Sequence, residues 1–166
     1  MHEKWISGFR QTMHALTKFI AVSLVFLGQA SANSDVDNLL AQSTTPDGVV
    51  FEIVESDKSA LEYLLPRVRE AITKIREKFP DMDFAVVSHG REEFALQTRY
   101  QTEQSEIHNA VLSLVAEEIP VYVCETHAGW YGVSADNFPD YVEVAPSGPG
   151  QINLYLELGY QLIVIE

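Results

Sequence analysis

The sequence predicts an α/β protein with a three-layer α/β/α arrangement around an open, mainly parallel, five-stranded sheet, flavodoxin-like in appearance. Two observations support this fold class. Apolar runs such as Ala85–Val87 and Leu162–Ile165 contain no alternating polar residues, which is typical of strands buried on both faces. The runs also alternate along the chain with segments of helical periodicity. Such alternation favours parallel strands joined by helical crossovers.

Each expected strand is a short run of β-branched or aromatic residues that ends at a polar or turn-forming residue. The strands are predicted at Val49–Val54, Phe84–Ser88, Val121–Cys124, Tyr141–Ala145 and Gln161–Ile165. Helical spacing of apolar residues predicts a first helix, capped by Asp57 or Ser59, that ends near Phe79. Further helices are expected over Ile107–Val115, Ser134–Asn137 and Ile152–Leu158. A polar, weakly patterned stretch over 91–104 has no assigned element.

The amino-terminal residues 1–32 have the pattern of a secretory signal peptide. Basic residues up to Lys18 precede the ten-residue apolar segment Phe19–Gly28, and Ala30-Ser-Ala32 supplies the small residues of a cleavage site. The apolar segment is shorter than the roughly 20 residues that a membrane-spanning helix needs. We therefore expect a periplasmic or secreted protein with no membrane association after cleavage. Residues 33–48 are predicted to form a flexible arm, and 49–166 a single α/β domain.

The charge of the chain argues against a nucleic-acid partner. The formal net charge is −13, and the leader is basic, so the exported part is more acidic still. Phosphate backbones require a basic face. The remaining basic residues lie mostly along the first long helix among glutamates, a pattern that predicts a solvated helix face.

Cys124 is the only cysteine, and it ends the apolar run Pro120–Cys124 just before the turn Glu125–Gly129. With no second cysteine, it cannot form an internal disulfide. A thiol delivered by a strand into a loop that opens a helix meets unpaired backbone N–H groups, which favour the thiolate. In an oxidising compartment, a lone cysteine of this kind requires an explanation.

Several interpretations of Cys124 remain open at this stage. The thiol is a buried small hydrophobic group, a reactive sulfur-carrying group, an intermolecular partner or a metal ligand. The metal interpretation rests on the Cys124-x-x-His127 pair, with His89 expected at the same edge of the sheet. Three such ligands with an open position would suit copper or zinc, whereas a structural zinc site needs four.

The carboxyl ends of parallel strands share one edge of the sheet, which is where ligands bind in such folds. This edge is expected to gather Cys124, His89 and His127. The imidazoles either assist the thiol as bases or cations or have plainer roles, a hydrogen bond to the neighbouring loop for His89 and solvent exposure for His127. The small-residue loop Ser147–Gly150 should lie there too. His108 lies on the polar side of its predicted helix, so we expect it to be a solvent-exposed surface residue. Trp130 and Tyr131 could line a pocket beside the thiol, but core packing or a subunit contact is the simpler expectation for them.

No nucleotide-binding or nucleophile-elbow motif is present, which disfavours nucleotide enzymes and serine hydrolases. The junction segments instead resemble the DsrE/DsrF-like family of small α/β proteins associated with sulfur relay and sulfur oxidation. The residues that carry the resemblance are Val86–Gly90, Ile119–Thr126, Val144–Gly148 and Leu158–Tyr160, and the likeness extends over 49–166.

The resemblance implies that Cys124 carries sulfur as a persulfide, because relay members use a cysteine at this junction. It also implies a homo-oligomer, a trimer or hexamer, and a protein that donates or accepts sulfur. No resident cofactor is expected. The alternative function is a non-catalytic binding or assembly module whose strand edge holds a metal or small ligand.

Overall fold

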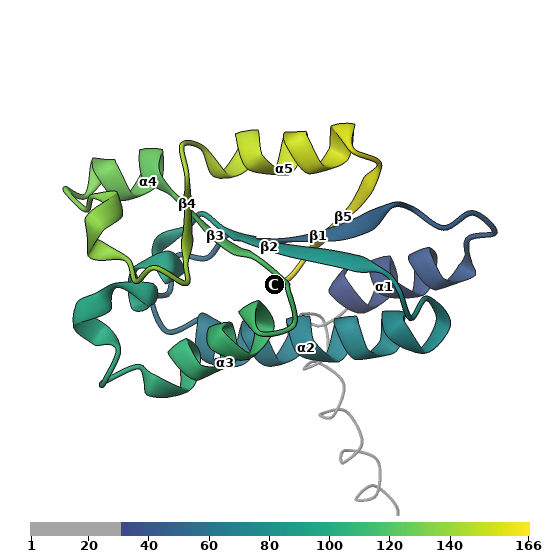
Figure 1. The fold of residues 1–166 in the computed structure, drawn as a ribbon, viewed down its shortest axis with the longest axis horizontal. Helices are drawn as coiled ribbons and strands as arrows, with labels where there is room; N and C mark the ends of the chain where they lie inside the picture. The colour runs from purple at the N-terminus through teal and green to yellow at the C-terminus, as the bar shows by residue number, and fades with distance from the viewer. Residues whose placement is uncertain (1–30) are drawn as a thin grey trace, which may run out of the picture.

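The computed structural model describes residues 31–166, which form an α/β fold with a five-stranded sheet (Figure 1). The expected signal peptide, 1–32, lies outside the described residues except for its last two. The strands are β1 (Gly48–Ile53), β2 (Asp83–Ser88), β3 (Val121–Cys124), β4 (Glu143–Ala145) and β5 (Tyr160–Val164). All five predicted strands are confirmed, with small shifts at their ends.

The strand order is β4-β3-β2-β1-β5, and every pairing in the described sheet is parallel. This order puts β2 between β1 and β3, so the loop after β2 is flanked by the ends of both neighbours. At the carboxyl edge, Ser88 pairs with Ile53 on one side and with Val123 on the other. Cys124 pairs in turn with Ala145 of β4. The edge predicted to carry function is therefore formed by β1 to β4.

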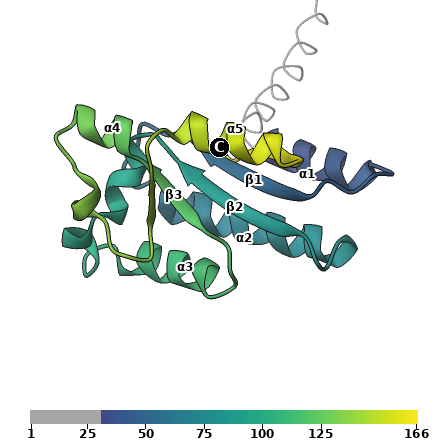
Figure 2. The ribbon, with the colours of Figure 1, turned by 45° about the horizontal axis from the view of Figure 1, so that its top comes forward.

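The helices are α1 (Ser31–Ala41), α2 (Leu61–Lys78), α3 (Ser105–Val115), α4 (Glu125–Trp130) and α5 (Gly148–Glu157), with 3-10 helices η1 (Arg91–Leu96), η2 (Thr98–Tyr100) and η3 (Ala135–Asn137). Figures 1 and 2 show α1, α2 and α3 on one side of the sheet, with α4 and α5 on the other. None of the described helices is long and apolar enough to cross a membrane.

The two faces of the sheet have cores of different size because successive residues of a strand point to opposite faces. On β1, Phe51 joins the large core with Leu64 of α2 and Ile107 of α3. Its neighbour Val50 joins a small core that contains only three other buried residues, Ala85, Val87 and Ile152. The helix α5 thus covers its face almost alone.

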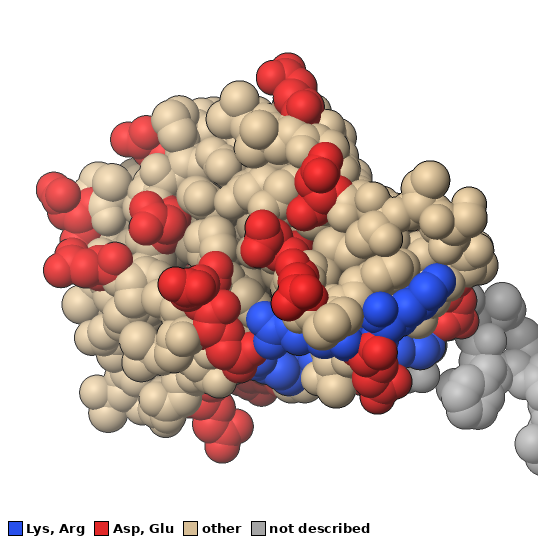
Figure 3. All heavy atoms as spheres, turned by 45° about the vertical axis from the view of Figure 1, so that its right-hand side comes forward, with Lys and Arg blue, Asp and Glu red and all other residues tan. Residues whose placement is uncertain are grey.

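The basic residues of α2 lie mainly along the outside of this helix, as expected for a solvated face. Arg69 and Arg76 both pair with Glu117, which follows α3, and Lys74 pairs with Asp37 of α1. Figure 3 shows the basic side chains as one narrow band bordered by acidic ones. These exposed pairs contribute little stability each.

The segment 33–48 is not a flexible arm over its whole length, which corrects the expectation from sequence. Helix α1 occupies its first part, and Val36 and Leu39 are buried in the large core beside α2. Only Val36, Leu39 and the partly buried Leu40 carry this packing in an otherwise polar segment, so the helical pattern extends over little more than one turn of the sequence. Residues 31–41 therefore belong to the folded domain.

Replacing Val36 with alanine is expected to lower the free energy of unfolding by about 1.5 kcal/mol, because two buried methyl groups are lost and a cavity remains. Urea unfolding of the full chain measures the change. The matched control is Asn38→Ala in the same helix, whose side chain is exposed and whose effect should stay within about 0.5 kcal/mol. Equal stability of the Val36 variant and the wild type would show that α1 is not packed on the domain.

Candidate functional site

Cys124 lies at the carboxyl end of β3, where the chain passes directly into α4. Val121 and Val123 are buried and fix the strand in the sheet. Cys124 is the residue that caps α4, and its Sγ accepts a hydrogen bond from the backbone N–H of His127 at 3.3 Å. The residue is only 4% exposed, while the next two, Glu125 and Thr126, are exposed. The sulfur is thus held just below the surface with a backbone donor directed at it.

A buried carboxylate, Glu93, connects Cys124 with His127. It comes from η1, is 0% exposed, and its Oε2 accepts a hydrogen bond from the backbone N–H of Cys124 at 2.9 Å. Its Oε1 lies 2.8 Å from Nδ1 of His127. Burial raises the pKa of Glu93 to about 7, against the lowering effect of the Cys124 and His127 hydrogen bonds. Near neutral pH, a proton is therefore gained or lost at this cluster.

Aromatic rings enclose the imidazole of His127. The ring of Phe94 stacks on it at a centroid distance of 5.5 Å, and the rings of Trp130 and Tyr131 meet it at 5.7 and 5.2 Å. Trp130 and Tyr131 are themselves exposed. They are therefore not core residues, and within the described chain both pack on His127, while Tyr131 also packs on Phe94.

His89 lies at the same edge but has different partners. Its Nε2 is 2.8 Å from Glu52 Oε1 of β1. A Cβ placed on Gly148, at the start of α5, would lie 2.5 Å from the Cβ of His89, so the helix approaches this histidine as closely as glycine allows. Of the three predicted site residues, the structure connects Cys124 and His127 through Glu93, and it places His89 against Glu52 and Gly148.

Glu92, next to Glu93, is a second buried carboxylate that the sequence did not reveal. Its oxygens accept hydrogen bonds from the Ser88 hydroxyl at 2.8 Å and from the backbone N–H groups of Gly90 and Glu55 at 2.9 and 2.7 Å. It thus joins the loops that follow β1 and β2. Consecutive glutamates in a polar stretch are usually exposed to solvent. Here both are buried, because the fold brings η1 next to the loops that follow β1, β2 and β3.

His108 is buried, contrary to the expectation of a surface histidine. Its Nε2 lies 3.1 Å from the Ala95 carbonyl oxygen and its Nδ1 lies 2.6 Å from the Tyr141 hydroxyl. Burial lowers the pKa of His108, although the Ala95 carbonyl opposes this change. A neutral ring that donates from Nε2 and accepts at Nδ1 satisfies both contacts. His108 therefore braces η1, which carries Glu93, against α3.

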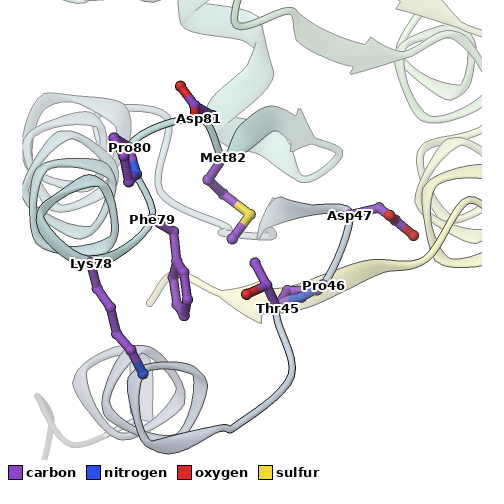
Figure 4. A pocket seen from close by; sticks show the side chains of 8 residues that line it. All are labelled: Thr45, Pro46, Asp47, Lys78, Phe79, Pro80, Asp81 and Met82. Atoms are coloured by element: carbon purple, nitrogen blue, oxygen red, sulfur yellow. The ribbon is translucent and has the colours of Figure 1, made fainter.

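The metal interpretation of this edge gains no support from the structure. Among the described residues, no group of three or more His, Cys, Asp or Glu side chains is placed to hold a metal ion. A surface pocket of about 270 Å³ lies elsewhere, between the segment before β1 and the turn before β2, at the opposite edge of the sheet from Cys124. Figure 4 shows Phe79 and Met82 pointing into it and Asp81 pointing away.

Comparison with known proteins identifies solved structures with a similar fold. No protein-family model matches the sequence, and no curated protein matches it significantly. Among solved structures, the chain is similar to the protein of unknown function MTH1491 from Methanobacterium thermoautotrophicum, with a TM-score of 0.57 and 23% identity over 70% of this chain and 96% of that one.

The YchN protein from E. coli is also similar, with a TM-score of 0.53 and 20% identity over 71% of this chain and 99% of its own. Both neighbours are covered almost completely, so the shared part is the whole α/β domain and not a fragment of a larger one. At these identities the likeness concerns the fold. The protein thus has a parallel, flavodoxin-like α/β fold that is similar to the folds of MTH1491 and YchN.

Proposed function

We propose that the protein is an exported, DsrE/DsrF-like sulfur-handling protein in which Cys124 accepts and passes on a sulfane sulfur. The observation that carries the proposal is the contact of the only cysteine with His127 and, through its backbone, with the buried Glu93. Burying the Glu93 carboxyl group beside Cys124 and His127 costs free energy, and this cost favours a chemical role for the cluster over simple packing.

The cluster supports thiol chemistry in two ways. The backbone N–H of His127 points at Sγ, and a hydrogen bond to sulfur stabilises the thiolate more than the thiol. Glu93 and His127 hold a proton between them, since an ionised carboxylate requires N–H at Nδ1 and a protonated one donates to it. The site can therefore gain or lose a proton at Glu93, next to the cysteine, near neutral pH.

The proposed reaction conserves atoms and electrons without an external oxidant. The Cys124 thiolate attacks a sulfane sulfur of a polysulfide, and a new S–S bond forms at Sγ. The S–S bond of the donor breaks, and its electron pair leaves with the shortened polysulfide, which takes up a proton from water. Transfer to an acceptor thiolate is the same step in reverse. Within this scheme, His89 and Glu52 fix the adjacent loop and the start of α5 rather than the sulfur.

Incubation of the full chain with polysulfide tests the proposal. Intact-mass spectrometry should show a gain of one sulfur, about 32 Da, that a reductant removes and that Cys124→Ser lacks. In parallel, the native thiol should react with an alkylating agent near neutral pH without unfolding of the protein, although more slowly than in denaturant because Cys124 is only 4% exposed.

The opposite result would favour the binding-module interpretation. A wild type that takes up no sulfur, and whose thiol is alkylated only after unfolding, would make Cys124 a packing residue. Because the chain has a single cysteine, the labelled site needs no further assignment, and the denatured protein serves as the control for accessibility.

A further inference from the structure

The 3-10 helix η1 is held at both of its ends by buried polar side chains, and Glu93 lies between these two points. At the start of η1, the Glu92 carboxylate accepts hydrogen bonds from backbone N–H groups in the loops that follow β1 and β2. At its end, the Ala95 carbonyl oxygen lies 3.1 Å from Nε2 of His108, a residue of α3 that is 3% exposed. Hydrogen bonds within a 3-10 helix have poor geometry, so the position of η1 depends on these outside contacts.

A tyrosine from a distant segment completes the contact at the end of η1. The hydroxyl of Tyr141, in the turn before β4, lies 2.6 Å from Nδ1 of His108 and accepts a hydrogen bond from Gln101 Nε2 at 3.1 Å. Figures 1 and 2 show that the chain between α4 and β4 crosses from the α5 side of the sheet to the side of α3. This crossing brings Tyr141 to His108.

The two contacts of His108 depend on each other. Since the Ala95 carbonyl can only accept, the ring donates to it from Nε2 and accepts a hydrogen bond from the Tyr141 hydroxyl at Nδ1. Without this hydroxyl, the tautomer with its proton at Nε2 loses its advantage. The other tautomer places two acceptors opposite each other at Ala95 and cannot make the bond. The Tyr141 hydroxyl therefore keeps His108 in the form that holds η1.

The thiol site depends on the position of η1. Ala95 is two residues after Glu93, whose carboxylate oxygens lie 2.9 Å from the backbone N of Cys124 and 2.8 Å from Nδ1 of His127. A displacement of η1 by about 1 Å would lengthen these contacts beyond hydrogen-bonding distance. His127 in turn donates its backbone N–H to the Cys124 sulfur. A shift at the end of η1 would thus reach both residues that surround the sulfur.

We propose that Tyr141 and His108 are positioning residues for the thiol: by holding the end of η1, they keep Glu93 bonded to Cys124 and His127 and so set the reactivity of Cys124. The inference rests on the proposed function, in which Cys124 is the group that reacts with sulfane sulfur. It assigns a role in that reaction to two residues that belong to the opposite end of η1 from the Glu92 contacts.

The variant Tyr141→Phe tests this inference in the full chain, because it removes the hydroxyl and keeps the ring. Uptake of sulfur from polysulfide near neutral pH, followed by intact-mass spectrometry, should become about fivefold slower. His108→Gln should slow uptake at least as much. The double variant should be no slower than His108→Gln alone, because both substitutions act through the same bond to Ala95.

The pH profile of Cys124 alkylation supplies a measurement that a purely structural role would not change. Burial raises the pKa of Glu93 to about 7, and His127 and Glu92 are the charged groups that act on it. The wild type should therefore show a step near pH 7 that Glu93→Gln lacks. In Tyr141→Phe, water reaches a loosened η1. Burial is the largest influence on Glu93, so the step should move to lower pH by about 0.5–1 unit.

The matched control is Tyr155→Phe, which removes the partly buried hydroxyl that donates to Tyr122 at 3.2 Å on the α5 side of the sheet. Both its uptake rate and the pH of its alkylation step should equal those of the wild type. Circular dichroism and thermal unfolding establish that the variants fold. Equal effects of Tyr141→Phe and Tyr155→Phe would overturn the proposal, as would slower uptake in Tyr141→Phe with an unmoved step.

Sulfur uptake by the wild type separates this inference from the proposed function. Normal uptake, with the same rate and the same step in Tyr141→Phe, would reject the positioning role and leave the thiol chemistry intact. A wild type that takes up no sulfur, with an alkylation step that Tyr141→Phe moves and Tyr155→Phe does not, would reject the sulfur chemistry and keep the positioning of Cys124. No uptake together with an unmoved step would reject both.

Discussion

Replacing Glu93 with alanine is expected to lower the free energy of unfolding by about 3–4 kcal/mol and to expose the thiol. The substitution removes the acceptor for the Cys124 backbone N–H and the partner of His127 Nδ1 at a fully buried position. Each buried group left without a partner costs about 1–3 kcal/mol, and the lost side chain adds a cavity. Denaturant unfolding and the alkylation rate of Cys124 measure the two effects.

The conservative variant Glu93→Gln separates charge from packing, because glutamine keeps an acceptor and nearly the same shape. In the wild type, burial raises the pKa of Glu93 from 4.5 to about 7. Between these pH values the folded state binds a proton that the unfolded chain has released. The contribution of Glu93 is thus fully present below about pH 4.5 and declines as the pH rises to about 7, by on the order of 3 kcal/mol.

Glu93→Gln cannot titrate, so the difference in stability between wild type and variant should itself change with pH across this range. Unfolding of both proteins at several pH values between 4.5 and 7.5 gives that difference. The contributions of the other carboxyl groups are the same in both proteins and cancel in it. A constant difference would mean that Glu93 keeps its ordinary pKa. Alkylation of Cys124 should also depend differently on pH in the variant, which a purely structural role for Glu93 would not produce.

Gly90→Ala should lower the free energy of unfolding more than the addition of a single methyl group anywhere else at this edge of the sheet. A Cβ at Gly90 would lie 2.3 Å from Glu92 Oε2 and 2.6 Å from the backbone N and O of Glu55. The backbone of Glu55 cannot move away cheaply, because Glu55 N donates to Glu92 and Glu55 O accepts from Arg91. We expect a loss of about 2–3 kcal/mol, measured by denaturant unfolding.

The matched control is Gly129→Ala, at a glycine of the short helix α4 that follows Cys124. Nothing lies within 4 Å of a Cβ at this position, so alanine should be neutral or should stabilise the helix by about 0.5–1 kcal/mol. If the two alanine variants had the same stability, the close approach of the loops after β1 and β2 would not exist as described.

The parts of the fold that depend on local pattern were predictable from the sequence. Runs of uninterrupted apolar residues predict buried strands, and β3 begins and ends where expected, at Val121 and Cys124. The placement of Cys124 beside His127 also followed, because both belong to one strand-to-helix junction. The position of His89 at the same edge was predictable from the parallel sheet, whereas its hydrogen bond to Glu52 was not.

The residues that the sequence did not reveal are those whose role depends on contacts between distant segments. Glu93 is 31 positions from Cys124 and lies in a polar stretch with no regular period, because 3-10 helices leave no clear pattern. His108 looked exposed because its burial depends on Tyr141, which is far along the chain. In each case a polar side chain is buried with a partner, which composition and periodicity do not report.

The uneven covering of the sheet has a consequence for how the molecule moves. Helix α5 contributes one buried side chain, Ile152, and the partly buried Tyr155 to a core of only four buried residues, while the opposite face is covered by α1, α2 and α3. Detaching α5 exposes little apolar area compared with unfolding the whole domain. The free energy of such a local opening is therefore expected to be a fraction of the global value, and α5 should open more readily than α2 or α3, which are packed in the large core.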